Sequence, residues 1–216
     1  MKVRVLSDLH LEFYENPDAC GVFDDVACDV VVLAGDIAQG THGIRWAADI
    51  FAGTPLVYVL GNHEYYGRDA SELLPRARGV AESLGVHLLE NDEVRIAGVR
   101  FLGCTLWTDF AAGGDPELAQ RMAEATINDF RLVSQQGGKL SPGHLVQWHE
   151  EAVAWLERQL DPADPAVVVT HFAPTLRTVN PRFGAGGALT PYFHCNLEHL
   201  MGDAAPVWIH GHSHHS

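Results

Sequence analysis

The chain has 216 residues, 47% of them hydrophobic, which is enough apolar material for one domain with a sizeable core and excludes a disordered chain. The formal net charge of −14 argues against non-specific binding to nucleic acid or to an anionic membrane. Divalent metal ions bound to aspartates would offset part of that negative charge.

No apolar run reaches the roughly 18 residues that a membrane-spanning helix needs, and the first residues lack the pattern of a signal peptide. The four cysteines have no Cys-x-x-Cys spacing, and we expect them to be free thiols in a reducing compartment. The sequence therefore predicts a single domain over residues 1–216 that works in the cytoplasm.

Uninterrupted apolar runs predict strands that are buried on both faces, as in a parallel sheet. The predicted strands cover residues 2–6 at the amino terminus, 29–34, 56–60, 166–170 and 207–210. The spacing of apolar residues predicts helices over residues 44–51, 69–84, 116–128, 141–160 and 196–201. Alternating strands and helices are typical of an α/β fold with a parallel sheet and helices outside it.

The pattern changes after Gly85, where short apolar segments at residues 86–89, 94–97 and 99–104 are joined by tight turns. Such segments predict consecutive antiparallel strands, with a hairpin that turns at Gly98. They would form either a second sheet or an antiparallel extension of the first.

Five of the predicted strands end in side chains that can bind a metal ion. In chain order these side chains are Asp8 and His10, Asp36, Asn62 and His63, His171, and His212 and His214. Adjacent strands would bring these ends together at one edge. Carboxylate, imidazole and amide ligands suit Mn, Fe or Zn and do not fit a thiolate zinc site. Seven donors from these eight side chains are too many for one ion, so we expect two ions that share one carboxylate.

The same residues, taken in order, resemble the motifs of the calcineurin-like metallophosphoesterases. The matching segments are Asp8-x-His10, Gly35-Asp36, Gly61-Asn62-His63-Glu64, a strand-end His171 and Gly211-His212-Ser213-His214. The resemblance covers nearly the whole chain. It implies two facing mixed β-sheets flanked by helices on both outer sides, a four-layer αββα fold.

The resemblance also implies a role for each residue. Asp8, His10 and His214 would hold one metal ion, Asn62, His171 and His212 would hold the other, and Asp36 would bridge the two. His63 would not be a ligand but would stabilise the transition state or protonate the leaving oxygen, so His63 and Asp36 are the expected catalytic residues. The two divalent ions would be Mn, Fe, Zn or Ni, with Mn expected to support activity in vitro.

Two features depart from the family pattern. The family commonly has a second aspartate three residues after the Gly-Asp motif, and this chain has Gln39 there. That carboxylate is not a metal ligand in the pattern, so only an outer contact is affected. Family members also often continue with further strands after the last motif, whereas this sequence ends two residues after His214, so the closing edge of one sheet is open to question.

These residues predict a dinuclear phosphoesterase that hydrolyses phosphomonoester or phosphodiester bonds by in-line attack of a metal-bridging hydroxide. We expect a phosphorylated small molecule as substrate, because the acidic surface argues against a dedicated nuclease. One alternative is a non-catalytic scaffold that keeps the fold for protein binding. Another is a metal-dependent hydrolase of non-phosphate esters or amides, which the absence of an H-x-H-x-D-H cluster disfavours. The oligomeric state is left open.

Three further side chains lie in the Gly- and Pro-rich segment that follows His171. His194 is a weaker candidate for substrate contact. Arg177 and Arg182 could grip a phosphate through their guanidinium groups, although a surface position is the simpler reading of each. The segment from residue 174 to residue 191 is long enough to be more than a connector.

Overall fold

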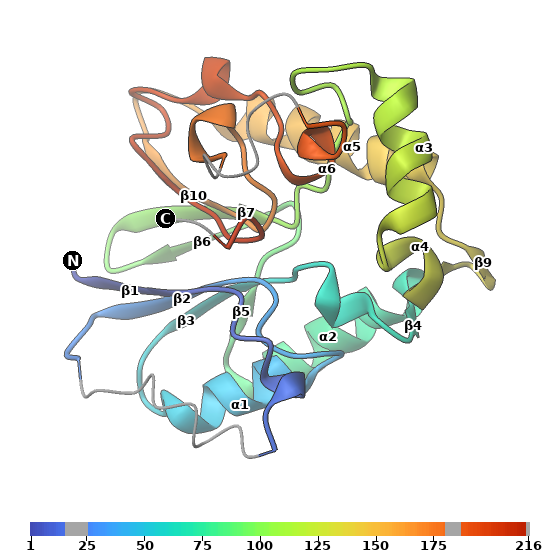
Figure 1. The fold of residues 1–216 in the computed structure, drawn as a ribbon. Coiled ribbons are helices and arrows are strands. Elements are labelled where there is room, and N and C mark those ends of the chain that lie inside the picture. Colours follow the sequence, from blue (N-terminus) through green and yellow to red (C-terminus); the bar gives the residue numbers. More distant parts are fainter. Residues whose placement is uncertain (16–25, 180–186, 215–216) are drawn as a thin grey trace.

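The computed structural model describes residues 1–15, 26–179 and 187–214, and in it two four-stranded sheets lie face to face between outer helices (Figure 1). The first sheet has the order β1 (Val3–Leu6), β2 (Val30–Ala34), β3 (Leu56–Val59) and β5 (His87–Leu88). The second sheet has the order β11 (Val207–Ile209), β10 (Ala166–Thr170), β7 (Val99–Cys104) and β6 (Asp92–Ile96). This arrangement confirms the predicted α/β class with two facing sheets.

Helices cover the outer faces of both sheets. On the first sheet these are α1 (His42–Ile50) and α2 (Ala70–Leu84), and on the second α5 (Pro142–Gln159) (Figure 1). Shorter helices lie beside the sheets, namely α3 (Pro116–Thr126), α4 (Asp129–Leu132) and α6 (Thr190–Phe193). A small third sheet consists of β4 (Arg68–Asp69), β8 (Val133–Gln135) and β9 (Gly138–Lys139). Single 3₁₀ turns occupy Leu11–Phe13, His63–Tyr65, Leu176–Thr178 and Glu198–Leu200.

The alternating side chains of β2 explain why the central strands are apolar throughout. Val30 and Val32 point between the two sheets, where they join a cluster that includes Phe101 of β7. Val31 and Leu33 point the other way into the larger cluster beneath the helices. Because both faces of the strand are covered, every residue of β2 is buried.

Most predicted elements are confirmed, and Gly85 ends α2 in the left-handed conformation with φ of 68°. The prediction for residues 86–89 was wrong in one respect. This segment is not an antiparallel neighbour of the hairpin, because β5 pairs parallel to β3 in the first sheet. Helix α2 provides the crossover that a parallel connection requires. The first sheet is accordingly parallel throughout, and only the second is mixed, through the antiparallel pair β6 and β7.

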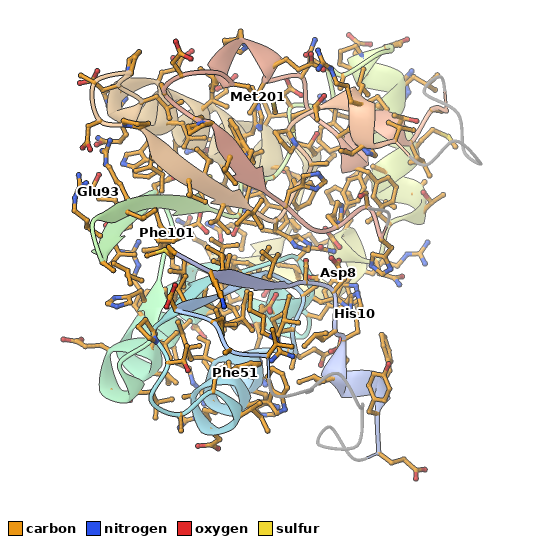
Figure 2. All side chains as sticks on the ribbon, turned by 90° about the vertical axis from the view of Figure 1, so that its left-hand side faces the viewer. Asp8, His10, Phe51, Glu93, Phe101 and Met201 are labelled. Atoms are coloured by element: carbon orange, nitrogen blue, oxygen red, sulfur yellow. The ribbon has the colours of Figure 1, made fainter. Side chains whose placement is uncertain are left out.

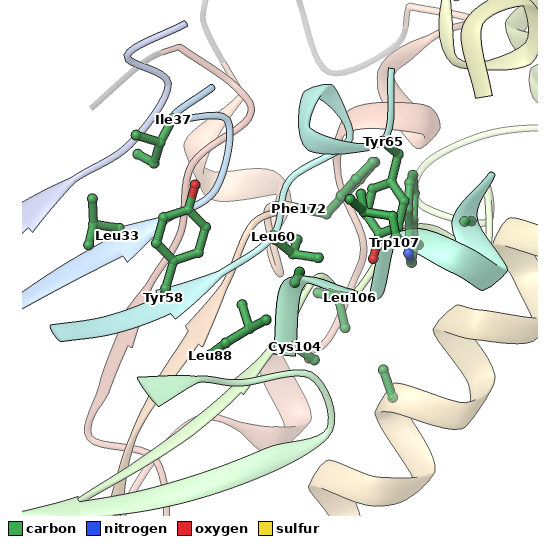
Figure 3. Close-up of a cluster of buried hydrophobic side chains, with 14 of the residues drawn as sticks. Leu33, Ile37, Tyr58, Leu60, Tyr65, Leu88, Cys104, Leu106, Trp107 and Phe172 are labelled. Carbon is green, nitrogen blue, oxygen red and sulfur yellow. The ribbon is translucent and has the colours of Figure 1, made fainter. Parts of the chain in front are cut away.

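Aromatic side chains pack beneath the loops that follow the strands. The ring centroid of Trp107, which follows β7, lies 5.4 Å from that of Tyr65 and 5.4 Å from that of Phe172 (Figure 3). Tyr65 ends the 3₁₀ turn that follows β3, and Phe172 lies two residues after β10. The apolar core therefore fixes the positions of loops that belong to different sheets. No helix in the described part of the chain is long and apolar enough to cross a membrane.

Candidate metal centre

The predicted ligands come together where the strands of both sheets end. Asp8 and His10 follow β1, Asp36 follows β2, Asn62 and His63 follow β3, His171 follows β10, and His212 and His214 follow β11. Figure 2 shows Asp8 and His10 side by side where the chain leaves β1, between the two halves of the molecule. The expectation that these strand ends meet is thus fulfilled in the geometry.

One group of donors consists of Asp8, His10 and His214. The Nε2 atoms of His10 and His214 lie 3.1 Å apart, and the Nε2 atom of His214 lies 3.3 Å from Oδ1 of Asp8. The Ser7 hydroxyl donates to Oδ2 of Asp8 at 2.5 Å, and the backbone N–H of His212 also donates to this carboxylate. These contacts fix the Asp8 carboxylate next to the two imidazoles.

A second group of donors is more deeply buried. The Nε2 atom of His171 lies 3.1 Å from Oδ1 of Asn62 and 3.3 Å from Oδ2 of Asp36. His212 joins Asp36 and His171 in this group. Its Nε2 atom is buried and has no hydrogen-bond partner among the described residues. Burial lowers the pKa of His212, so the ring is neutral and offers a free lone pair.

The carboxylate of Asp36 lies between the two groups and is only 1% exposed. The backbone N–H of His63 donates to its Oδ1 atom at 2.8 Å. The other oxygen, Oδ2, faces His171 at 3.3 Å and the Nε2 atom of His10 at 3.9 Å. One carboxylate oxygen is therefore within reach of both donor groups.

The spacing of the donors fits divalent cations. Two ligands about 2.1 Å from one ion lie roughly 3 to 3.5 Å apart in octahedral or tetrahedral geometry. The separations between donor atoms in both groups, 3.1 to 3.3 Å, fall in this range. Two imidazole nitrogens facing each other at 3.1 Å need a proton or a cation between them, and the orphaned nitrogen of His212 needs a partner as well. The residues present therefore fit bound metal ions.

The backbone at the candidate ligands is unusual. Five of them have positive φ angles between 47° and 66°, namely Asp8, His10, Asp36, His212 and His214. Residues other than glycine rarely adopt this left-handed conformation, and each instance costs on the order of 1 to 3 kcal/mol. Such strain is typical of positions that aim a side chain at a functional site.

Gly61 and Gly211 allow the strand ends to approach each other. A β-carbon at Gly61 would lie 2.8 Å from the ring of His171 and would collide with Asp36. A β-carbon at Gly211 would collide with Ser7 and would lie 2.6 Å from Oδ2 of Asp8. These close approaches explain why a glycine stands at each position.

Glu64, which follows the predicted ligands Asn62 and His63, stabilises the loops around the centre. Its buried carboxylate accepts hydrogen bonds from the backbone N–H groups of Asp36, Ile37 and Gly61 and from the hydroxyl of Tyr58, at 2.7 to 2.9 Å. The carboxylate therefore joins the loop after β2 to the loop after β3. This contact holds Asp36 beside Asn62 and His63.

The tautomer of His171 is set by the backbone. Its Nδ1 atom donates to the carbonyl oxygen of Ala34 at 2.8 Å, which directs Nε2 towards Asp36 and Asn62. Burial lowers the pKa of His171, but the Asp36 carboxylate outweighs that effect and raises the pKa to about 10. Burial likewise raises the pKa of Asp36, yet the charge on His171 brings it below its usual range. The site thus attracts positive charge.

His63 is held by a carboxylate that sequence analysis did not identify. The Nδ1 atom of His63 lies 2.9 Å from Oε1 of Glu12, and its Nε2 atom lies 4.0 Å from Oδ2 of Asp36. Glu12 therefore gives His63 a carboxylate partner. Its position two residues after His10 was a signal available in the sequence, but only the structure shows that it meets His63.

Asp129 is a second residue that sequence analysis missed. Its carboxylate is fully buried and accepts hydrogen bonds from Nδ2 of Asn62 at 2.9 Å, from the Tyr66 hydroxyl at 2.9 Å and from the Tyr192 hydroxyl at 2.5 Å. Because Nδ2 of Asn62 is engaged in this way, its Oδ1 atom faces His171 and the centre. No local motif marks Asp129, since it is separated from Asn62 by 67 residues.

Arg177 and His194 do not belong to either group of donors. Arg177 is exposed and pairs with Glu198 at 2.6 Å, which fits the surface position considered for it. Arg182 lies outside the described residues. His194 is buried in the segment after His171 and lines a pocket next to His212 and His214.

Comparison with known proteins identifies the class to which this arrangement belongs. The family model described as calcineurin-like phosphoesterase matches residues 1–216, and the chain belongs to this family. It is a metal-dependent phosphoric ester hydrolase, and the proposed resemblance is confirmed.

Two proteins, one of them also with a solved structure, are similar to the chain. An uncharacterized protein of Acanthamoeba polyphaga mimivirus is 23% identical over 245 residues, covering 99% of this chain and 85% of that protein. The [acyl-carrier-protein] phosphodiesterase PptH of Mycobacterium tuberculosis is 30% identical over 194 residues, covering 80% of this chain and 59% of PptH. The crystal structure of phosphopantetheinyl hydrolase (PptH) from Mycobacterium tuberculosis shares the fold, with a TM-score of 0.78, 20% identity and coverage of 99% of this chain and 83% of that chain.

Proposed function

We propose that the chain hydrolyses phosphomonoester or phosphodiester bonds at a centre of two divalent metal ions. The observation that carries this proposal is the position of Asp36, whose Oδ2 atom lies between two separate groups of donors. In the proposed centre Asp8, His10 and His214 hold one ion, Asn62, His171 and His212 hold the other, and Asp36 is shared. Mn is the ion we expect to support activity in vitro, and Fe, Zn and Ni suit the same ligands.

When bound, the two ions would neutralise the phosphoryl oxygens and supply a nucleophile derived from water near neutral pH. The chain itself contributes the remaining functions. The Asp36 carboxylate fixes the centre, because the backbone N–H of His63 and the donors around it leave it a single orientation. In-line attack on phosphorus requires a proton for the leaving oxygen on the opposite side.

His63 is the proposed source of that proton. Glu12 accepts a hydrogen bond from its Nδ1 atom, so Nε2 is directed towards the centre. The ring also packs against Tyr66, with centroids 4.2 Å apart, which restricts its rotation. The geometry therefore supports a general acid or a transition-state contact and does not require His63 as a ligand.

A narrower candidate function is the hydrolysis of a phosphodiester on a carrier protein. The 30% identity to the acyl-carrier-protein phosphodiesterase PptH favours it, although the chain spans only 59% of the length of that protein. The substrate would then be a phosphorylated protein in place of a small molecule. We also propose that residues 1–216 form a single domain. We further propose that the protein works in the reducing cytoplasm, which agrees with the free thiols of the described cysteines Cys28, Cys104 and Cys195.

Hydrolysis of bis-p-nitrophenyl phosphate and p-nitrophenyl phosphate tests the general proposal. We expect turnover with added Mn, loss of turnover after treatment with a chelator, and recovery when Mn is restored. Absence of turnover with both substrates, while two equivalents of Mn are bound, would favour the scaffold or a hydrolase of another ester. Release of phosphopantetheine from a holo acyl carrier protein, measured by mass spectrometry, tests the narrower function.

A further inference from the structure

A large apolar pocket opens next to the candidate metal centre. Its volume is about 690 Å³, within the range of about 300 to 1,000 Å³ for small-molecule sites. One wall consists of His212, Ser213 and His214, and apolar side chains of Met122 and Phe193 belong to the other walls. The pocket is therefore continuous with the donors proposed to hold the metal ions.

The apolar walls come from two elements that pack together. Met122 lies on α3 and Phe193 ends α6, and these two helices contact each other (Figure 1). The Phe193 ring lies 5.0 Å from the ring of His212, so the apolar surface reaches the metal centre itself. Leu189, just before α6, extends the same surface. An apolar group attached to a phosphate at the centre would therefore meet a continuous apolar surface that leads into the pocket.

His194 gives the pocket a buried polar group. The residue is 5% exposed, and neither ring nitrogen makes a hydrogen bond of normal geometry with the described residues. Burial lowers the pKa of His194 more than the carbonyls of Thr178 and Thr190 raise it, so the ring is neutral near pH 7. The ring of His194 therefore belongs to the pocket wall, but both of its nitrogens are enclosed by protein and lie near these two carbonyls.

The pocket also lies away from the proposed acid. The rings of His63 and His10 are 4.3 Å apart, and those of His10 and His214 are 5.0 Å apart, so His63 and His214 are both neighbours of His10. His214 lines the pocket, whereas His63 is not among the described residues around it. An ester arm in the pocket would therefore lie beside His214 and not beside the proposed proton source of the leaving group.

We propose that this pocket binds the ester arm that stays on phosphorus, and that this arm is an extended apolar chain. The proposal rests on the proposed phosphoesterase function and deepens it by naming a substrate class. A phosphodiester with one long arm would be preferred over a phosphodiester with a short one.

Binding tests the pocket without turnover. Isothermal titration calorimetry of the Mn-loaded protein compares octyl phosphate with methyl phosphate. Each methylene that becomes buried is expected to tighten binding by about three- to fourfold, so octyl phosphate should bind at least tenfold more tightly. The heat capacity change should also be more negative for octyl phosphate. Equal affinities would overturn the proposal whether or not the protein is an enzyme.

Turnover provides the second test, with p-nitrophenyl octyl phosphate and p-nitrophenyl methyl phosphate as substrates. The wild-type ratio of kcat/KM, octyl over methyl, should exceed ten. Met122→Glu places a charge in the apolar wall and should bring this ratio close to one. Leu118→Glu is the matched control, because Leu118 lies on the same helix at similar exposure, 42% against 38%, but does not line the pocket, and its ratio should equal that of the wild type.

Hydrolysis of the methyl ester without any chain-length effect would reject the pocket and leave the phosphoesterase intact.

Discussion

Histidine, carboxylate and other donor side chains gather at two places in the described part of the chain, and the two places differ in how well the donor atoms are satisfied. One is the candidate centre around Asp36. The other consists of Asp109, His149 and Cys195, whose potential ligand atoms also lie within 4.8 Å of one another. By residue type alone, both groups could bind a metal ion.

In the cluster of Asp109, His149 and Cys195 the protein itself provides hydrogen-bond partners for the donor atoms. The Nδ1 atom of His149 donates to the carbonyl oxygen of Leu106 at 3.2 Å, and the thiol of Cys195 donates to the carbonyl oxygen of Trp107 at 3.4 Å. Burial raises the pKa of the Cys195 thiol and lowers the pKa of His149, so both groups are held in their neutral forms. These side chains are accounted for by ordinary packing and hydrogen bonding.

Around Asp36 the donors instead lack partners or face one another. The Nε2 atom of His212 is buried without a hydrogen bond, and the Nε2 atoms of His10 and His214 oppose each other at 3.1 Å. The backbone is strained at five of the seven candidate ligands. The comparison teaches that unsatisfied lone pairs and positive φ angles at the donor residues themselves set the candidate centre apart from a packed polar cluster. A positive φ nearby is not enough, because Leu106, Trp107 and Phe110 beside the Asp109 cluster have one as well.

Replacement of the shared carboxylate, Asp36, should have the largest effect and should separate the two sites most clearly. In Asp36→Asn we expect metal content to fall and kcat/KM to drop by well over about 100-fold, the upper figure for groups that only support a ligand. Metal analysis by mass spectrometry and hydrolysis of bis-p-nitrophenyl phosphate measure the two effects. Asp109→Asn, in the cluster of Asp109, His149 and Cys195, is the matched control, and this variant should keep full metal content and activity. Equal losses in both variants would refute the distinction.

Removal of the proposed acid should separate chemistry from metal binding. His63→Ala is expected to lower kcat by about 10²- to 10⁴-fold, because the leaving oxygen loses its proton source, while the metal content stays at the wild-type value. A substrate with a good leaving group, such as bis-p-nitrophenyl phosphate, should be affected less than a phenyl ester. Loss of metal together with activity would instead make His63 a ligand.

A smaller effect is expected from Asp129, which acts only through Asn62. Asp129→Asn should weaken Mn binding by about 10- to 100-fold, because Asn62 loses the contact that orients its amide. Saturating Mn should restore most of the turnover, and this recovery distinguishes a positioning role from a general loss of structure. Asp115→Asn, at the exposed amino-terminal cap of α3, is the control and should bind Mn like the wild type. A Mn affinity equal to that of the wild type in Asp129→Asn would rule out this role.

The smallest predicted effect is a proton released on metal binding. Because Asp36 raises the pKa of His171 to about 10, this ring carries a proton in the metal-free protein at pH 7.5, and a cation must displace it. Affinity for Mn should therefore rise with pH between pH 6.5 and 9 and fall as the solution becomes more acidic. Calorimetry in buffers of different ionisation enthalpy would show the released proton as a buffer-dependent heat. A heat independent of the buffer would contradict this account.

The sequence predicts where the candidate ligands lie, because each of them follows a strand that its apolar run reveals. Val30 to Ala34 must be buried on both faces, which places Asp36 at a sheet edge. The sequence also predicts a strand at residues 86–89, but not its parallel pairing in the first sheet, which depends on the crossover through α2. It also does not predict β8, since a three-residue segment with two polar side chains carries no periodic signal.

The supporting contacts could not be predicted because they depend on tertiary structure. Glu12 meets His63 across 51 residues, and Asp129 meets Asn62 across 67 residues. Neither pair has a spacing that local geometry would bring together. His194 likewise joins the pocket wall only through the tertiary structure.

Anomalous diffraction from a crystal of the chain soaked in Mn tests the central claim most directly. The account predicts two Mn peaks on either side of Asp36, one bonded to Asp8, His10 and His214 and the other to Asn62, His171 and His212. It also predicts no peak at the cluster of Asp109, His149 and Cys195. A single peak that does not touch Asp36, or peaks only elsewhere in the molecule, would contradict it.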